Sequence, residues 1–332
     1  MADHVYFTEG SGLQNSIYGK SQEPIKMFIE KKAEAFEAQS VVNKIFALDK
    51  SNNYAEKYTA MTAMSGFQPV GENGLYPDDM MQESFSKVLE HMTWKDSFRI
   101  SQEMVEDSKL IDLKKQPAAF ISAYYRTREK FGAALLAGGL GTASTVNFSG
   151  KTFDVTSADG VTLFNTAHTG KAYEAQSNKF ADAFSVDALG ALECAMQDFR
   201  GDTGEVLDVA PDTIIIPNSH TLKKAVFEAV GADKDPETSN NGFNYQFGRW
   251  NIIVWPYLNQ FIGNTTPWIL MDSRYNEEYA GAVWLDRVAL TVHSTIDDET
   301  DANVWRGRAR FIAGFNDWRA FAVGGVTGGT EL

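Results

Sequence analysis

Helical spacing of apolar residues marks two long segments of the chain. Apolar side chains recur three, four or seven positions apart from residue 25 onward, and neither glycine nor proline interrupts residues 25–65. This pattern predicts an amphipathic helix over residues 24–47. A stronger helical pattern covers residues 117–137, where Pro117 suits a first helical turn and the glycines at 138–141 suit the end. We expect this second helix to be a rod of roughly 30 Å.

Between these helices, residues 51–104 predict extended structure. Residues 54–64 and 85–100 are strand-like in part, and the glycines and prolines at 66–77 interrupt the pattern between them. The segment therefore predicts one long ribbon with an irregular tip. A two-stranded ribbon is marginally stable by itself in water, so we expect another surface to cover it. Six of the ten methionines lie in this segment, which suits either an adaptable contact surface or the protein's own core.

Residues 142–294 predict a mixed region of helices and strands. Ser185 is a suitable cap for a helix over 186–200, and a buried strand over 212–217 precedes a helix over 219–230. Further strands are predicted over 249–255, 268–271 and 283–292. The one cysteine, Cys194, lies beside Leu192 and Met196 in the first of these helices, which favours a buried and unreactive thiol.

Residues 303–325 predict a final strand with two different faces. Arg306, Arg308 and Arg310 alternate with apolar or small residues, so the three arginines share one face of the strand. An acidic run at 297–301 precedes them and suits a solvated turn or ion pairs rather than a calcium loop, because it lacks the loop spacing and its glycine. The arginine face fits acidic groups of neighbouring subunits, or it is a plain solvated face.

The overall charge excludes one class of function. The chain of 332 residues holds 44 acidic and 30 basic side chains, a net charge of −14. A dedicated nucleic-acid binder needs a surplus of basic residues to neutralise phosphates, so this balance argues against one. The apolar runs are far shorter than the ~20 residues that span a bilayer, and we expect no membrane partner.

Enzyme motifs are present only as near misses. Residues 150–152 (GKT) resemble the end of a phosphate-binding loop, but Thr145 stands where that loop needs its first glycine. The five histidines are scattered without the spacing of zinc ligands, and His168 suits a loop hydrogen bond. We therefore predict no catalytic residues, no cofactor and no metal site. The elements instead indicate a subunit that completes the burial of its arm, ribbon and rod helix against neighbours.

The order of these elements resembles the major capsid proteins of tailed bacteriophages, which share the Hong Kong 97-like fold. The resemblance runs through DTIIIPNSHTLKKAVFEAV at 212–230, RWNIIVWPYL at 249–258, WILMD at 268–272 and NVWRGRARFIAGFNDWRAFAVGG at 303–325. LFNTAHTG at 163–170 and GFNDWR at 314–319 are similar to the Mu-type major head protein branch.

The resemblance implies an α+β fold in five regions. These are an N-terminal arm and helix (1–50), an extended loop (51–104), a peripheral domain with a spine helix (105–141), an axial domain (142–294), and the return strands of the peripheral domain with the C-terminus (295–332). It also implies a protein without catalysis that forms pentamers and hexamers in an icosahedral shell around phage DNA. The shell would assemble in the bacterial host cytoplasm and become part of the virion.

Partners and contact residues follow from the same resemblance. Because the predicted loop begins near residue 51, we expect a separate scaffolding protein or a chain already trimmed, together with a portal. Double-stranded DNA would be enclosed without sequence-specific binding. The candidate contacts between subunits are Met61, Met64, Phe67, Met80, Met81, Arg306, Arg308 and Arg310. Two alternatives stay open, namely an encapsulin-like bacterial nanocompartment shell protein and a soluble enzyme or binding protein of unknown class.

Overall fold

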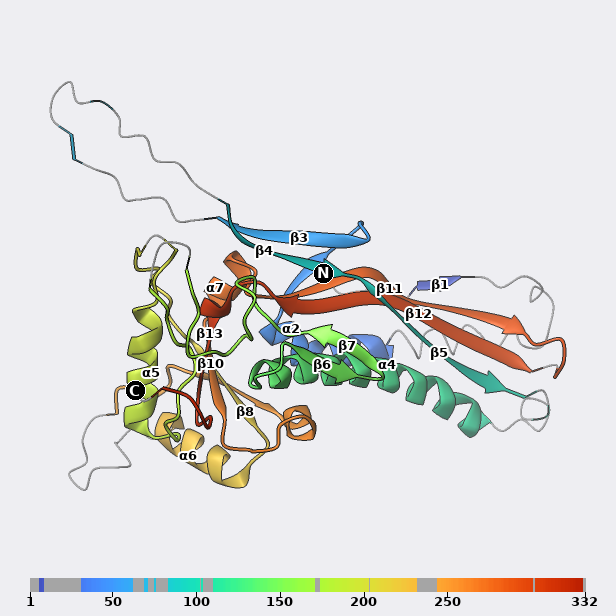
Figure 1. Ribbon diagram of the computed structural model, residues 1–332. Coiled ribbons are helices and arrows are strands. Elements are labelled where there is room, and N and C mark those ends of the chain that lie inside the picture. The colour runs from blue at the N-terminus through green and yellow to red at the C-terminus, as the bar shows by residue number, and fades with distance from the viewer. Residues whose placement is uncertain are drawn as a thin grey trace.

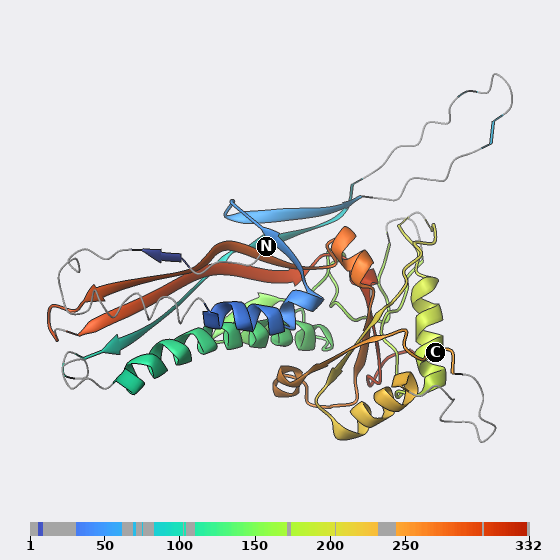
Figure 2. The same cartoon turned by 180° about the vertical axis from the view of Figure 1, so that it is seen from behind.

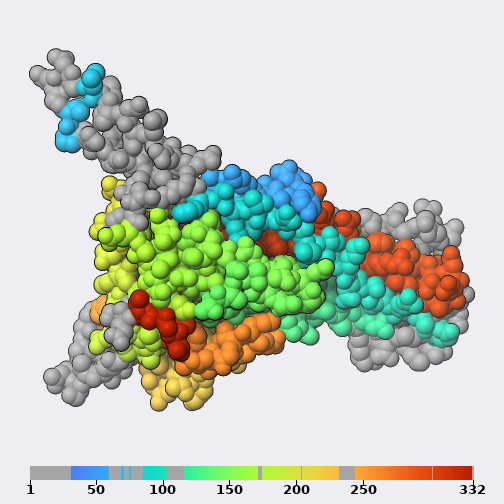
Figure 3. Space-filling model, in the orientation of Figure 1, coloured from blue at the N-terminus to red at the C-terminus, as the bar shows by residue number. Residues whose placement is uncertain are grey.

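A computed structural model describes residues 6–8, 31–61, 69–70, 75, 83–101, 103, 110–170, 174–202, 204–231, 244–300 and 302–330. In this part of the chain, a long sheet forms an elongated half of the molecule and a smaller sheet forms a rounder half (Figure 1). The space-filling view has the same outline, with residues of the long sheet extending away from the body (Figure 3).

The long sheet contains the longest strands of the described chain. β1 (Tyr6–Thr8), β11 (Ala282–Ile296), β12 (Asn303–Phe315) and β5 (Met92–Ile100) follow one another, and β2 (Ala47–Lys50) pairs with a different stretch of β11. The predicted two-faced strand is confirmed along β12, because Trp305, Gly307 and Ala309 are buried whereas Arg306 and Arg308 are exposed.

The spine helix α4 (Leu110–Gly139) runs along one face of this sheet (Figures 1 and 2). Phe120, Ile121 and Phe131 are buried on its sheet-facing side. The helix begins at Leu110, so the prediction that Pro117 is its first turn was wrong. A proline inside a helix removes one hydrogen bond, and here the packing of the following apolar turns on the sheet outweighs that loss.

An aromatic core joins α4 to the sheet and to a short hairpin. The hairpin consists of β6 (Thr145–Phe148) and β7 (Lys151–Asp154). Trp94 stacks on Phe311 with 4.9 Å between ring centroids, and Phe131 meets Phe153 edge-on at 4.7 Å. Rings in these arrangements add roughly 0.5–1.5 kcal/mol per pair beyond the area that they bury.

A buried ion pair fixes the register of α4 against β11. Arg128 donates two hydrogen bonds to the Asp286 carboxylate, at 2.8 and 2.9 Å, and its guanidinium lies 4.7 Å from the centre of the Trp284 ring. Burial alone would lower the pKa of Arg128, but Tyr124 and Asp286 raise it above its usual range. The side chain therefore stays charged inside the core.

The N-terminal helix is shorter than the sequence predicts. Within the described residues, one helix covers 31–39 and a separate turn forms α2 (Val42–Ile45), so the prediction of a single helix over 24–47 was wrong in this part; residues 24–30 lie outside the described chain. The break has a cause on α4. Glu129 accepts hydrogen bonds from the Ser40 hydroxyl at 2.6 Å and from the Val41 amide at 3.0 Å.

The smaller sheet has the strand order β13 (Phe321–Gly324), β10 (Trp268–Met271), β8 (Thr213–Pro217) and β9 (Asn251–Trp255). The helices α5 (Val186–Gln197) and α6 (His220–Gly231) flank it, and α7 (Ser273–Glu278) and the 3-10 turn η1 (Pro256–Gln260) lie at its ends (Figure 1). Every residue of β8 and β10 is buried, which explains their uninterrupted apolar sequence.

Two sequence predictions about α5 have different outcomes. The Ser185 hydroxyl accepts a hydrogen bond from the Ala188 amide at 3.0 Å, so the predicted helix cap is confirmed. Cys194 is exposed, so the prediction of a buried thiol was wrong. Its neighbours Leu192 and Met196 are buried, but Cys194 is two positions from each and therefore points to the solvent side of the helix.

The single final strand that the sequence predicts over residues 303–325 forms two strands, and these belong to different sheets. β12 ends at Phe315, the turn η2 (Trp318–Ala320) follows, and β13 then enters the smaller sheet. Asp317 accepts a hydrogen bond from the Arg319 amide at 3.0 Å and begins this turn. The segment 314–319 therefore carries the chain from the elongated half to the rounder half.

A ribbon of β3 (Ala55–Met61) and β4 (Glu83–Glu90) lies over the long sheet, on the face opposite α4 (Figures 1 and 2). In the described part of the chain these two strands pair only with each other. β5 also falls within residues 51–104, and it pairs with β12 along its whole length. The five domain boundaries of the sequence analysis stay a prediction.

Candidate subunit interface

The face of the long sheet opposite α4 carries a row of basic side chains, which we call the basic strip. β5 and β12 are antiparallel, and residues that pair across them project from the same face. Lys95 pairs with Arg308, and Ser97 pairs with Arg306. The basic strip consists of Lys95, Arg99, Arg306, Arg308 and Arg310.

The basic strip is unfavourable for the isolated subunit. Like charges directly opposite each other in a sheet, such as Lys95 and Arg308, destabilise it. In the described chain, the acid that forms an ion pair with the strip is Asp297, whose carboxylate lies 3.5 Å from Arg99. Arg99 is 65 % exposed, and exposed pairs of this kind contribute little. The strip is therefore complementary to an acidic surface outside this chain.

The structure places the predicted contact residues unevenly. The three arginines lie together on the basic strip, as their alternation predicts, and the strip adds Lys95 and Arg99, which the sequence analysis did not name. Positions 95 and 99 are four residues apart and therefore lie on the same face of a strand, so alternation along β5 could have identified them. Met61 ends β3, and nothing is described of its side chain. Met64, Phe67, Met80 and Met81 lie outside the described residues.

The root of the β3–β4 ribbon is fixed to the body by a buried lysine. The Lys87 ammonium donates to the Asp154 carboxylate at 2.5 Å and to the Thr156 carbonyl at 2.9 Å. Burial would raise the pKa of Asp154, but its hydrogen bonds from Lys87 and Thr156 hold it below its usual range. Leu89 lies over Gly314, where a Cβ would come within 2.5 Å of the leucine side chain.

A histidine joins the two segments that carry the Mu-type resemblance, 163–170 and 314–319. His168 is fully buried and stacks on Trp318, with 4.2 Å between ring centroids. Its Nδ1 lies 2.6 Å from the Asp159 carboxylate and its Nε2 lies 3.1 Å from Asn178 Oδ1. The prediction of His168 as a loop hydrogen bonder is confirmed, and this histidine clasp holds the turn between the two sheets.

The hydrogen bonds of Asn178 fix the geometry of the histidine clasp. Asn178 Nδ2 donates to the carbonyls of Leu163 and Phe321, and Oδ1 accepts from the Asn165 amide, so the side chain has one orientation. Both nitrogens of His168 therefore have a polar partner, and the ring is held between Asp159 and Asn178.

A second buried charge cluster lies next to the clasp. The Arg319 guanidinium donates to Asp202 at 2.9 Å and to Asp317 at 3.3 Å, and the Tyr275 hydroxyl donates to Asp317 at 2.9 Å. Burial and the charge of Asp317 raise the pKa of Tyr275 far above its usual range. The tyrosine therefore remains a hydrogen-bond donor, and the cluster holds α7 and the turn η2 together.

Comparison with known proteins decides the family. A sequence model of the family described as phage capsid protein matches residues 87–324, well over half of the 332-residue chain. The chain belongs to the phage capsid protein family. The matched region contains the basic strip, the histidine clasp, the smaller sheet and the strands β5, β11 and β12 of the long sheet. Membership makes the chain a structural capsid shell protein. No curated protein matches it in sequence.

Solved structures similar in fold to this capsid protein include a GTA capsid, a phage and a virus-like particle. The capsid of a native GTA particle is 14% identical and covers 85% of this chain and 88% of its own, with a TM-score of 0.51. Microbacterium phage Oxtober96 is 12% identical, and the match covers 86% of this chain and 90% of that chain, with a TM-score of 0.50. A virus-like particle from Pyrococcus furiosus is 10% identical, and the match covers 92% of this chain and 99% of that chain, with a TM-score of 0.51. At these identities the likeness concerns the fold, which is the Hong Kong 97-like α+β fold that the sequence predicts.

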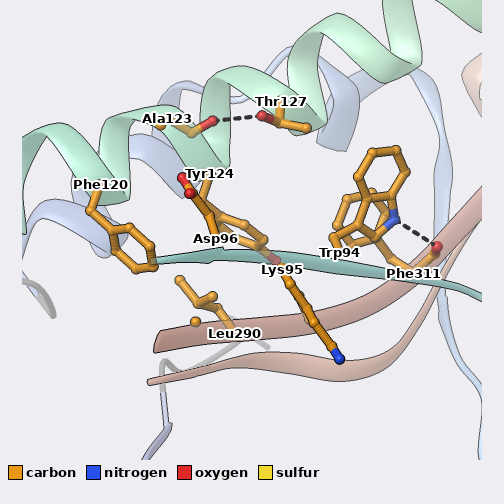
Figure 4. A pocket seen from close by; sticks show the side chains of 11 residues that line it. Trp94, Lys95, Asp96, Phe120, Ala123, Tyr124, Thr127, Leu290 and Phe311 are labelled. Atoms are coloured by element: carbon orange, nitrogen blue, oxygen red, sulfur yellow. Dashed lines mark hydrogen bonds between the residues drawn. The ribbon is translucent and has the colours of Figure 1, made fainter. Parts of the chain in front are cut away.

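A small pocket lies between α4 and the long sheet of the capsid protein (Figure 4). Phe120 and Tyr124 of α4 face Trp94 of β5 and Leu290 of β11 across about 90 Å³. Its lining is mainly apolar and aromatic, and also includes Lys95, Asp96 and Thr127. It is a packing gap beside Gly307 rather than a site for chemistry.

No group of three or more His, Cys, Asp or Glu side chains among the described residues is arranged to hold a metal ion. None of the described helices combines the length and the apolar character needed to cross a membrane.

Proposed function

We propose that this capsid protein assembles as pentamers and hexamers into an icosahedral shell that encloses phage DNA. The observation that carries the proposal is the basic strip on the face of the long sheet opposite α4, in a chain whose net charge is −14. Five cations on one face of an otherwise acidic protein repel one another and attract the acidic surface of the next copy.

The chain supplies a matching acidic segment. Residues 58–86, which include the connection between β3 and β4, contain four acidic residues and neither lysine nor arginine. If this segment lies on the basic strip of a neighbouring copy, opposite charges pair. The contact also covers the β3–β4 ribbon, which has no other strand beside it in the described chain. Many moderate contacts of this kind add avidity in a closed assembly.

The finer partners belong to the same proposal. A separate scaffolding protein and a portal would direct assembly in the bacterial host cytoplasm, and the shell would hold double-stranded DNA without reading its sequence. The arm, extended loop, peripheral and axial domains would follow the boundaries at 50, 104, 141 and 294. An acidic inner wall binds DNA weakly, because like charges repel, and this favours DNA release.

Electron microscopy and sedimentation of the purified full chain test the proposal. We expect rings of five or six copies, or closed shells with icosahedral symmetry, in equilibrium with free subunits. A monomer or small oligomer at every concentration up to the millimolar range would contradict the proposal.

A bacterial nanocompartment shell is the alternative, because a similar fold occurs in a structure described as a virus-like particle. The two functions differ in what the particle encloses. Particles recovered from cells that express the chain with its phage partners should absorb at 260 nm as nucleoprotein. Particles that contain protein cargo and no nucleic acid would favour the nanocompartment.

A further inference from the structure

A buried histidine without hydrogen-bond partners lies where the β3–β4 ribbon joins the long sheet. His91 connects β4 to β5 and is 6 % exposed, and neither of its ring nitrogens has a hydrogen-bond partner. The Arg310 Nε, also buried, has no acceptor either. Buried donors are almost always satisfied, because an unmade hydrogen bond destabilises the fold, so two such residues together need an explanation.

The sheet register brings these groups to one face. Thr93 pairs with Arg310, so His91, two positions away on the same chain, is the diagonal neighbour of Arg310 on that face. The β11 strand is irregular between Asp286 and Val288, and Arg287 is the extra residue there. Both arginines are half-buried, so part of each side chain is accessible to solvent.

The strongest charges that act on His91 are positive. Burial first, and then the charges of Arg287 and Arg310, hold the pKa of His91 below its usual range. Two acids also face the ring, Glu56 of β3 and Asp286 of β11, and both have other partners. Glu56 accepts from Ser51 and Asn53, and Asp286 binds Arg128. In the described chain, neither Arg287 nor Arg310 forms an ion pair.

We propose that His91, Arg287 and Arg310 form a binding site for a carboxylate of a second copy of this chain. One carboxylate pairs with the accessible parts of Arg287 and Arg310, and a shift of the Arg310 side chain brings its Nε and the His91 ring, both closed to solvent in the free subunit, within hydrogen-bond reach. The site continues the basic strip to the ribbon root. Every copy of this acidic chain carries an excess of carboxylates, so a neighbouring copy is the partner whose charge matches. The proposal rests on the proposed shell function for its occupant.

The first experiment tests the site in the unassembled full chain, with acetate as the probe. Thermal unfolding is measured in sodium acetate and in sodium chloride at equal ionic strength and pH 7. We expect acetate to raise the unfolding midpoint of the natural chain relative to chloride. The difference should disappear in Arg310→Gln and in His91→Phe, which removes both ring nitrogens at similar volume, and should persist in Lys151→Gln, an exposed charge-matched control on β7.

The second experiment measures assembly. Arg287→Gln and Arg310→Gln should each raise the subunit concentration needed for half-assembly by roughly tenfold or more, the usual loss for a charge-assisted hydrogen bond. Lys151→Gln should change it by less than about threefold. Circular dichroism and the unfolding midpoint in chloride show whether each variant is folded.

The outcomes separate this proposal from the proposed function. Loss of the acetate effect together with impaired assembly in the arginine variants supports it. Equal midpoints in acetate and chloride for the natural chain overturn it. An acetate effect with normal assembly of Arg287→Gln and Arg310→Gln also overturns it, because the site then takes a free anion and not a neighbour's carboxylate. If the natural chain never assembles, the proposed function fails, and with it the second copy as occupant.

Discussion

Buried charged side chains in this capsid protein each have specific partners, so single substitutions there separate the effect of charge from that of packing. Replacing Arg128 by Met should lower the free energy of unfolding by about 3–5 kcal/mol, because it leaves the Asp286 carboxylate buried without its cation. Denaturant unfolding of unassembled subunits measures this loss. The double variant Arg128→Met, Asp286→Leu should recover most of it, since both charges are then absent. A loss below 1 kcal/mol for the single variant would contradict the role of this pair.

The histidine clasp predicts a pH dependence with a definite sign. Burial would raise the pKa of Asp159, but its hydrogen bond and charge interaction with His168 hold the pKa below its usual value of 3.8. A carboxyl group with a lowered folded-state pKa stabilises the fold above its unfolded pKa, and this contribution is lost as the pH falls through the folded pKa. Asp159→Asn should therefore destabilise the subunit by about 1.5–3 kcal/mol at pH 7.

Acid titration checks this sign. The difference in unfolding midpoint between the natural chain and Asp159→Asn should shrink steadily below pH 4. Asp198→Asn, an exposed carboxyl at the end of α5, should leave the midpoint unchanged at every pH. A difference that is constant, or that grows toward acid, would show that the clasp does not depend on the Asp159 charge.

At the scale of elements, the packing of the β3–β4 ribbon on β12 requires a residue without a side chain at position 314. A Cβ on Gly314 would come within 2.5 Å of Leu89, so Gly314→Ala forces the ribbon root away from β12. We expect a loss of about 1–3 kcal/mol in subunit stability, typical of overpacking. Adding Leu89→Ala should restore the space and reduce the penalty from the clash. If Gly314→Ala is neutral, the ribbon is not seated on this glycine.

How much of the fold the sequence predicts differs from element to element, for physical reasons. Local signals were sufficient for β10, whose apolar run has clear ends, and for α5, where Ser185 supplies its own cap. The break after residue 39 was not predictable, because Glu129, which holds it, lies some ninety positions away. Pro117 inside α4 misled for the same reason, since the packing of the later turns on the sheet outweighs the hydrogen bond that the proline removes.

The candidate interface could be predicted only in part. Alternation along β12 placed three arginines on one face, which is a property of any strand. Their neighbour Lys95 comes from β5, and only the pairing of the two strands brings it beside Arg308. The histidine clasp was predicted as a single loop hydrogen bond at His168. No sequence motif marks its partners Asp159 and Asn178, because only the folded chain brings them next to His168.

At the scale of the whole molecule, the extended ribbon is predicted to serve assembly and not folding. Deleting residues 65–78 should leave a folded subunit, because both sheets and the aromatic core lie outside that segment. The same deletion should abolish shells if the acidic segment reaches a neighbour. Circular dichroism and electron microscopy measure the two effects. Normal shells from this variant would remove the proposed role of the ribbon.

The basic strip gives opposite predictions for the subunit and for the shell. Replacing Arg306, Arg308 and Arg310 by Ala should weaken particles more at 0.01 M than at 0.5 M salt, because salt already screens the ion pairs between copies. The unassembled subunit should keep its unfolding midpoint or gain stability, since like charges facing each other across β5 and β12 are removed.

A matched triple variant at exposed positions outside the strip, Lys151→Ala, Lys224→Ala and Arg274→Ala, changes the net charge equally and serves as the control. If both triple variants weaken particles alike, the effect belongs to total charge. If the arginine variant destabilises the subunit itself, the strip is structural. The strip is assigned to contacts between copies if three results occur together in the arginine variant: the particles are weaker, the unfolding midpoint of the subunit is unchanged, and the weakening is greatest at low salt. Only charges that meet across an interface produce all three results.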